Sequence, residues 1–409
     1  MTNVVYLVAI VGLLLLVFIH ELGHFTVARL VGMRPTRFYI GFPPAVVKRV
    51  RGGIEYGVGA IPLGGYVKIP GMFRPSERDV QRYFGPLLTA GEEVAPLVDD
   101  LQRSLVREDV ASLGHALDRL EQAVDQMEPS AATRLARSGI AELRDGISPY
   151  AYWRQATWRR VAVIGAGPAA NLLAAVVILA AVNTLGVPTR YSNSVANVVS
   201  GTPAEKGGIQ SGDAIIELDK QWITSPQQAS AIVQRVKGKA LLVTVIRNGK
   251  TVTLAPIRPE KQSDGDYRLG FYWKVYYRHD NPARGLARAG SQTWNVSREI
   301  ATSLPGLVQP KHRKEVSSVV GIVAVSGQTL RSDYRDYLRV VALISISLAI
   351  LNLLPFLPLD GGHILVALVE RVRRRALRRE LVERFSFVGF ALVGLLMYIG
   401  LTNDAHRYF

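Results

Sequence analysis

The sequence predicts a multi-pass α-helical membrane protein with four transmembrane helices. Hydrophobic residues make up 48% of the 409-residue chain, and four long runs hold many of them. The runs cover about residues 4–19, 161–187, 340–355 and 385–401. Each reaches or approaches the roughly 20 residues that a helix needs to cross about 30 Å of hydrocarbon. We therefore expect transmembrane spans at 1–32, 159–188, 337–362 and 382–403.

The positive charges indicate how these spans are oriented. The net charge is +16, and basic clusters follow the first span, precede the second, and separate the third from the fourth. Their members are Arg34, Arg37, Lys48, Arg49 and Arg51, then Arg154, Arg159 and Arg160, then Arg371, Arg373, Arg374, Arg375, Arg378 and Arg379. Lys and Arg beside short loops mark the cytoplasmic side. All three clusters fall there if both termini lie outside, so the chain is expected in the cell membrane, in contact with the lipid bilayer.

This distribution argues against a nucleic-acid partner, because such a partner would require the basic residues to converge on one groove-shaped surface. The chain has no cysteine. Disulfides are therefore excluded, and any metal must be held by histidines and carboxylates.

Two different segments separate the first two spans. Residues 33–75 contain Gly pairs at 52–53 and 64–65, with strand-like stretches at 54–60 and 66–69. They predict a membrane-associated β-hairpin on the cytoplasmic side. In residues 76–150, aliphatic side chains recur at helical spacing between charged ones, which predicts an inserted segment of two or three amphipathic helices. The helices could be a plain helical hairpin or could bind a regulatory partner.

Residues 190–258 have the alternating strands and turns of a compact, mostly β domain. Strands are expected at 195–199, 214–218 and 241–246. Gly201, Pro203, Ala204, Gly208, Ile209, Gly212 and Asp213 match the run G-x-P-A-x-x-x-G-(hydrophobic)-x-x-G-D. This segment resembles a PDZ domain, which captures peptides by strand addition, and the charge argument makes it extracytoplasmic. Residues 259–336 are expected to form a linker and, at about 285–307, an amphipathic surface helix.

The first span contains the motif His20-Glu-Leu-Gly-His24. Residues four apart on a helix share a face, so both histidines can direct a nitrogen at one metal ion. Glu21 then lies beside a metal-bound water and can take its proton. Polar residues inside a span cost several kcal/mol unless they face a protected interior. The motif therefore predicts a catalytic zinc (Zn2+) site with Glu21 as general base.

Asp360 is the best candidate for a third zinc ligand, because catalytic zinc usually keeps three protein ligands. His20 lies about 24 Å along a helix from Val4, and Asp360 lies at most about 30 Å from Val340. The first and third spans run in the same direction, so both residues reach the cytoplasmic edge of the membrane core. Asp360 could instead simply begin a helix or occupy a turn. His363 could also bind the metal, but it lies further toward the cytoplasm.

Several motifs in this order resemble the site-2 protease family of bacterial intramembrane zinc metalloproteases, specifically the PDZ-containing, regulator-of-sigma type. They are His20-Glu-Leu-Gly-His24, Gly64-Gly-Tyr-Val-Lys68, Gly167-Pro-Ala-Ala-Asn171, and Asn352 followed by Leu359-Asp-Gly361. The resemblance covers nearly the whole chain except 76–149. It implies zinc at His20, His24 and Asp360, with Glu21 as catalytic base. It also implies that Asn352 binds the substrate backbone while the hairpin pairs with an extended substrate.

The resemblance further implies hydrolysis of peptide bonds within transmembrane segments of single-span membrane proteins. Anti-sigma factors already cut once are one expected class of substrate, and remnants of signal peptides are another. A non-catalytic membrane scaffold that binds ligands through its PDZ domain is a different hypothesis. An intact Glu21 counts against it. A metal transporter is a third, and the lack of inverted repeats counts against that one.

Overall fold

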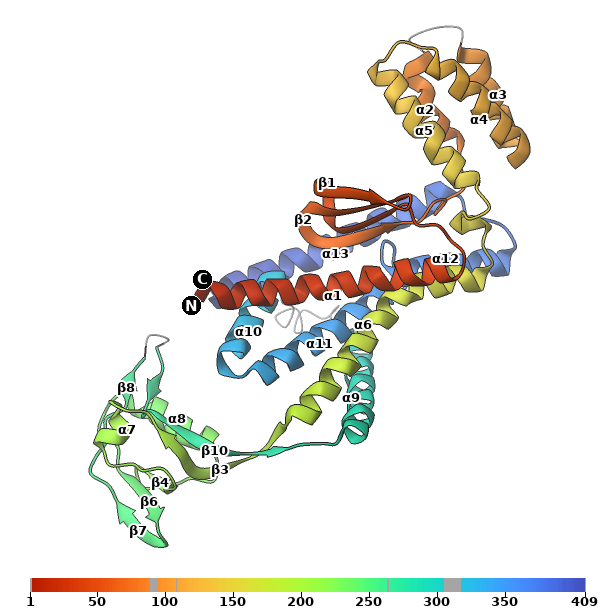
Figure 1. Ribbon diagram of the computed structural model, residues 1–409. Coiled ribbons are helices and arrows are strands. Elements are labelled where there is room, and N and C mark those ends of the chain that lie inside the picture. The colour runs from red at the N-terminus through yellow and green to blue at the C-terminus, as the bar shows by residue number, and fades with distance from the viewer. Residues whose placement is uncertain (1, 89–93, 108, 263–264, 305–317, 409) are drawn as a thin grey trace. The chain divides into compact units, whose positions relative to one another are not determined.

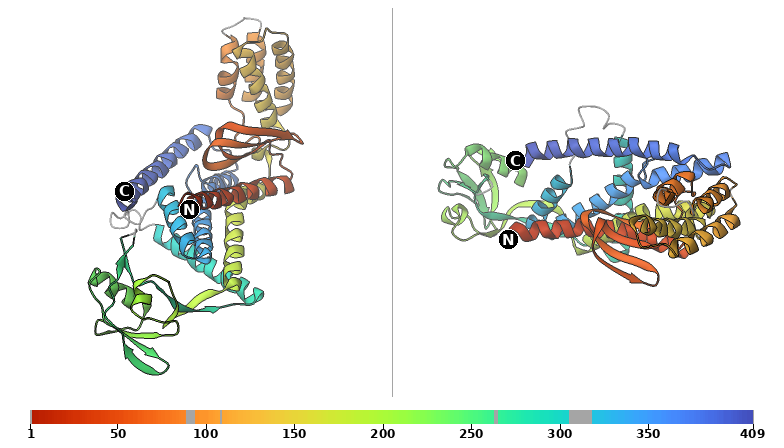
Figure 2. Two further views of the ribbon diagram at one scale, coloured as in Figure 1. Left: turned by 60° about the vertical axis from the view of Figure 1, so that its left-hand side comes forward. Right: turned by 90° about the horizontal axis from the view of Figure 1, so that it is seen from above.

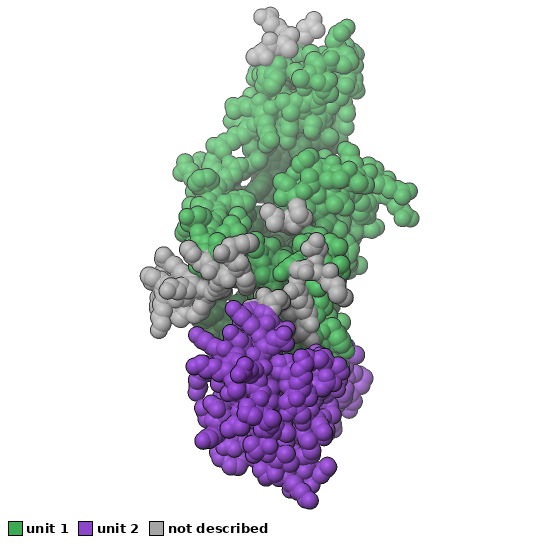
Figure 3. Space-filling model, turned by 90° about the vertical axis from the view of Figure 1, so that its left-hand side faces the viewer, with its two compact units in different colours: residues 1–179, 289–409 green, residues 180–288 purple. Residues whose placement is uncertain are grey.

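The computed structural model describes residues 2–88, 94–107, 109–262, 265–304 and 318–408. The chain forms two compact units (Figure 3). Unit 1 comprises Met1–Leu179 with Ala289–Phe409, and unit 2 comprises Ala180–Arg288.

Three long apolar helices dominate unit 1. They are α1 (Thr2–Leu30), α6 (Thr157–Leu185) and α13 (Arg379–Tyr408). Within the described residues, only their segments Val4–Leu30, Thr157–Leu185 and Arg379–Ala405 are both long and apolar enough to cross a membrane. Figures 1 and 2 show the C-terminal end of α1 at the same end of unit 1 as the N-terminal ends of α6 and α13. The expected basic clusters flank these three helix ends.

The predicted third span, 337–362, does not form one continuous helix. Helix α11 (Tyr334–Asn352) ends before Pro355 and Pro358, and α12 (Asp360–Arg373) begins a new helix. Proline lacks the amide hydrogen and clashes with the preceding turn, which explains the break. A further helix, α10 (Val319–Ser332), precedes α11. Asp333 separates the two and caps α11, because its side chain accepts a hydrogen bond from the amide of Arg335.

The predicted hairpin is longer and more folded than its sequence indicates. Strands β1 (Arg37–Arg51) and β2 (Ile54–Lys68) are antiparallel. Phe38 pairs with both Tyr56 and Val67, so the first part of β1 lies between the two ends of β2. The stretches expected at 54–60 and 66–69 therefore pair with β1 and not with each other. Residues 65–68 remain at an edge, with no further strand beside them in the described part of the chain.

The described residues of the inserted segment form four α-helices instead of two or three. They are α2 (Glu77–Leu88), α3 (Ala95–Val106), α4 (Val110–Asp125) and α5 (Ala131–Ile147). The expected aliphatic positions Val98, Leu101, Leu117 and Leu120 are buried in their shared core. The sequence underestimated the number because the buried face of α5 is partly Ala and Gly, which give a weak apolar signal.

Unit 2 contains a sheet in the order β10-β3-β4-β6-β7, with β5 beside β4. Its strands are β3 (Val187–Val198), β4 (Ala214–Leu218), β5 (Gln221–Trp222), β6 (Val243–Arg247), β7 (Lys250–Thr253) and β10 (Phe271–Arg278). Helices α7 (Pro203–Lys206) and α8 (Pro226–Val236) and the short pair β8 (Glu260–Lys261) and β9 (Tyr267–Arg268) complete it. Because β10 belongs to the sheet, the expected linker in fact begins inside this unit. Helix α9 (Pro282–Ser303) follows, and residues 305–307 of the expected surface helix lie outside the described residues.

Candidate metal centre

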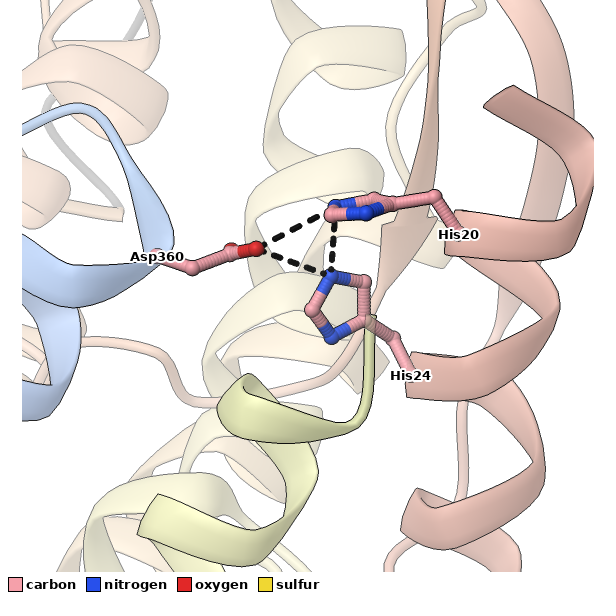
Figure 4. Close-up of side chains that lie close together, drawn as sticks. All are labelled: His20, His24 and Asp360. Carbon is pink, nitrogen blue, oxygen red and sulfur yellow. Dashed lines mark hydrogen bonds and ion pairs between the residues drawn. The ribbon is translucent and has the colours of Figure 1, made fainter. Parts of the chain in front are cut away.

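His20 and His24 project from one face of α1, as their spacing predicts. Their Nε2 atoms lie 3.2 Å apart, and each residue is only 7% exposed. The first half of α1 carries no charged side chain, so these histidines occupy a largely apolar helix. Figure 4 shows both rings directed at the side chain of Asp360.

Asp360 reaches the histidines from the first turn of α12. Its Oδ2 lies 3.1 Å from Nε2 of His20 and 3.4 Å from Nε2 of His24 (Figure 4). Two ligands of a tetrahedral zinc ion, each about 2.0–2.1 Å from the metal, are themselves about 3.3 Å apart. The three atoms therefore form one face of such a tetrahedron and leave its fourth corner open. Among the described residues, this is the one His, Asp and Glu group so arranged.

The protons around these atoms also fit a cation. Nδ1 of His24 donates a hydrogen bond to the carbonyl of Val163 at 2.8 Å, which leaves a lone pair on Nε2. Oδ2 of Asp360 is buried and accepts no hydrogen bond from the described residues. Electron-rich atoms this close repel one another unless a positive charge lies between them. The donor set is thus suited to a metal such as zinc.

A cavity of about 380 Å³ opens beside the three ligand atoms. Glu21 and Asn352 line it, together with the edge residues 65–67 of β2. Parts of the chain that are far apart in sequence (α1, β2, α11 and α12) therefore meet around one cavity. Side chains that could hold a metal, a further carboxylate and an exposed strand edge lie around this one cavity, a combination suited to peptide hydrolysis.

The sequence pattern of peptidase family M50 matches residues 8–396. The chain belongs to peptidase family M50. It is 28% identical to zinc metalloprotease RasP of Oceanobacillus iheyensis, with both chains fully covered. It is 26% identical to regulator of sigma-W protease RasP of Bacillus subtilis, with 96% of each chain covered. Metalloprotease MmpA of Caulobacter vibrioides is also 26% identical, with 98% of this chain and 96% of that one covered.

Membership of the M50 family makes the protein a membrane zinc metalloprotease, and the ligand geometry offers a site for that zinc. The other residues that the sequence predicts for the site lie at different places around these three side chains. Glu21 lines the cavity from α1. Asn352 lines it from the end of α11, where its amide donates to the carbonyl of Leu348 at 3.0 Å. His363 lines the cavity but stands outside the cluster of three ligand atoms.

Two glycines allow the M50 site to be this compact. A Cβ at Gly167 on α6 would overlap Nε2 of His24 and lie 2.8 Å from Cε1 of His20. A Cβ at Gly65 would lie 2.8 Å from Cγ of Glu21. The backbones of α6 and β2 therefore contact the site where a side chain would fill it. Both glycines occur in the motifs of the sequence, but nothing in the sequence indicates which residues they approach.

Asn171, one turn after Gly167 on α6, contacts the other nitrogen of His20. Its amide nitrogen lies 3.2 Å from Nδ1 of His20, while its Oδ1 is buried without a hydrogen-bond partner in the described chain. The two ends of an amide have nearly the same shape. A half-turn places Oδ1 against Nδ1, where it accepts the Nδ1 proton. That arrangement leaves a lone pair on Nε2 of His20, as metal binding requires.

Proposed function

We propose that this M50 protein is an intramembrane protease that hydrolyses peptide bonds within transmembrane segments of single-span membrane proteins. The convergence of His20, His24 and Asp360 in a cavity beside long apolar helices carries the proposal. Ionisable groups on such helices are costly unless they serve a protected site. The family supports the protease chemistry, and the apolar helices support the membrane setting.

The side chains around the cavity divide the reaction between them. His20, His24 and Asp360 hold the zinc. Bound zinc supplies a Lewis acid that lowers the pKa of water to near 7 and polarises a carbonyl. Glu21 accepts a proton from the attacking water and passes it to the amine that leaves. Gly65 leaves room for this side chain beside the proposed substrate edge, because a Cβ at that position would lie 2.8 Å from Cγ of Glu21.

A transmembrane substrate must unwind before it can be cut, because a helix hides its peptide bonds. The free edge at residues 65–68 offers backbone groups to which an extended substrate can add as a strand. Asn352 supplies a further amide once it releases the carbonyl of Leu348. Together these groups replace the hydrogen bonds that the substrate loses on unwinding.

The proposed topology is multi-pass, with four spans and the active site near the cytoplasmic side of the cell membrane. The first, second and fourth spans correspond to α1, α6 and α13, and the third to α11 with the turn up to Asp360. Residues 190–258 are proposed as an extracytoplasmic PDZ domain that binds a peptide or protein ligand. Support comes from the arginines that adjoin these helices in the sequence, because Figure 1 shows the C-terminal end of α1 at the same end of unit 1 as the N-terminal ends of α6 and α13.

Anti-sigma factors that have already lost their outer domain are the proposed substrates. The support is the similarity to a protein named regulator of sigma-W protease. The strand edge at residues 65–68 would bind the substrate backbone, so its hydrogen bonds do not themselves select one side-chain sequence.

The test is cleavage of a purified single-span substrate by the full-length protein and by Glu21→Gln. Removing a general base is expected to lower the cleavage rate by about 10²- to 10⁴-fold. Zinc content should stay at the wild-type level, because Glu21 is not among the ligands. Glu299→Gln is the matched control, since this glutamate is exposed on α9 and does not line the cavity. Undiminished cleavage by Glu21→Gln would refute the proposal.

A further inference from the structure

A second cavity, of about 430 Å³, lies next to the catalytic one. Its walls come from the segment before α2, the turn η2 (Tyr152–Arg154) and start of α6, the end of α12, and the start of α13. It shares Met72 and His363 with the catalytic cavity. Figure 1 shows the turn between α12 and α13 beside the start of α6. The proposed peptide hydrolysis assigns no role to any residue that lines this cavity.

The cavity carries an excess of positive charge. Arg74, Arg160, Arg371, Arg374, Arg375 and Arg379 line it, against only two carboxylates, Glu370 and Glu380. Glu370 is already paired with Arg160 at 2.7 Å and accepts a hydrogen bond from the amide of Leu377. Glu380 lies 3.7 Å from Arg78.

Three of these arginines have no counter-charge among the described residues. Arg379 pairs with Asp79 at 2.7 Å and with Glu383 at 2.8 Å. By contrast, Arg371, Arg374 and Arg375 make no ion pair with any residue that the structure describes. Guanidinium groups bind phosphate oxygens through paired hydrogen bonds, so such a cluster is suited to a phosphate.

The inner wall of the cavity also offers unused hydrogen-bond donors. The hydroxyl of Tyr152 and Nε of Arg160 are buried and have no partner in the described chain. Tyr152 is 2% exposed and Arg160 is 8% exposed, so bulk water does not readily provide hydrogen-bond acceptors for these donors. The guanidinium of Arg160 lies over the ring of Tyr152, 4.8 Å from its centroid, which fixes both groups. Buried donors without acceptors are expected to meet an acceptor from a ligand.

The cavity lies where two apolar helices begin. The candidate spans of α6 and α13 start at Thr157 and Arg379, and both residues line it. Trp158, in the first turn of α6, is 62% exposed, as expected for an aromatic residue at the level of lipid headgroups. On α13, Phe385 and Val388 are 67% and 65% exposed within two turns of the cavity. The occupant is thus expected to have an anionic end and an apolar end.

We propose that this cavity binds the headgroup phosphate of an anionic phospholipid, with the acyl chains lying along α13 from Phe385 onward. Arg371, Arg374 and Arg375 contact the phosphate, while Tyr152 and Arg160 donate from below. An acidic peptide could satisfy the arginines but not the exposed apolar face that continues from the cavity. Basic pockets at the cytoplasmic ends of transmembrane helices are suited to this kind of ligand. The proposal is independent of the proposed substrate and of the proposed residue roles at the zinc site.

The test measures binding of short-chain phosphatidylglycerol to the full-length protein in detergent, by thermal unfolding over a range of lipid concentrations. Short-chain phosphatidylcholine, inorganic phosphate and an acidic peptide are the comparison ligands. Saturable stabilisation by phosphatidylglycerol is expected, with at least tenfold weaker binding of the other three. The double variant Arg371→Gln with Arg375→Gln should bind phosphatidylglycerol about 25-fold more weakly than the wild type, taking a loss of roughly fivefold for each arginine.

Arg49→Gln with Arg51→Gln is the matched control, because it removes the same charge from the hairpin, outside this cavity. Its affinity should equal that of the wild type. If the double change at 371 and 375 prevents folding, Arg375→Gln alone should still show the fivefold loss. Equal affinities for both double variants would overturn the proposal. So would binding of inorganic phosphate or of the acidic peptide as tightly as phosphatidylglycerol.

Discussion

Replacing Asn171 by leucine tests how the zinc site is oriented. The side chain of Asn171 is buried on α6, and its amide meets Nδ1 of His20 at 3.2 Å. Leucine has the same number and branching of side-chain heavy atoms but offers neither donor nor acceptor. Nδ1 of His20 then loses its partner, and both the ring orientation and the tautomer become unconstrained. We expect the protein to fold and to bind zinc more weakly.

The expected loss of zinc affinity follows from removing the hydrogen-bond partner of His20, the side chain of Asn171. Loss of such a partner typically costs 10- to 100-fold in metal affinity, or about 1.4–2.8 kcal/mol. The partner of His24, the carbonyl of Val163, belongs to the backbone and is unchanged. The hydroxyl of Ser345 donates to the backbone carbonyl of Asn171, so α6 and α11 stay joined in the variant. The predicted loss therefore falls on His20 alone.

Competition with a zinc chelator measures this affinity directly, without reference to cleavage. Asn171→Asp should recover most of the lost affinity, because a carboxylate also accepts the Nδ1 proton of His20. Asn183→Leu is the control, since Asn183 is buried near the other end of the same helix and bonds to the carbonyl of Gly285. Equal zinc affinities for Asn171→Leu and Asn183→Leu would refute the reasoning. So would an aspartate variant no better than the leucine variant.

Two further predictions concern a close approach and a titrating pair. Gly167→Ala should lower zinc content below half of the wild-type level in metal analysis, because its methyl group would overlap His24; full occupancy would contradict this. In unit 2, burial would raise the pKa of Asp213, but its two 2.7 Å contacts with Arg247 hold that pKa below the usual 3.8. The pair should therefore stabilise unit 2 fully above about pH 4, and this contribution should vanish as pH falls through the lowered pKa. Amide hydrogen exchange in β4 measures this contribution. Asp213→Asn should lower the free energy of opening derived from that exchange by about 3 kcal/mol at pH 7; unchanged exchange would contradict the role of the pair.

The proximity of the three proposed metal ligands could be predicted from simple rules of helix geometry. Spacing by four places His20 and His24 on one face of a helix, whatever surrounds it. Asp360 lies at a similar depth in a parallel span, and the structure places its Oδ2 within 3.4 Å of both histidines. The break at Pro355 and Pro358 could also be anticipated, since these prolines end α11 before Asp360.

Other features depend on contacts that no short stretch of sequence encodes. The folding of β1 between the two ends of β2 depends on register shifts along both strands. The role of Asn171 depends on α6 packing against α1, which brings its amide to His20. Likewise, Gly65 looks like an ordinary turn glycine until β2 lies against Glu21. Long-range packing decides each of these contacts.

His20, His24 and Asp360 are proposed to bind one zinc ion together. X-ray absorption at the zinc edge, combined with metal analysis of the full-length protein, tests this proposal most directly. We predict one zinc per chain, bound by two imidazole nitrogens and by oxygen ligands, with the metal lost in Asp360→Ala and retained in His363→Ala. Zinc retained in Asp360→Ala, or lost in His363→Ala, would contradict the account.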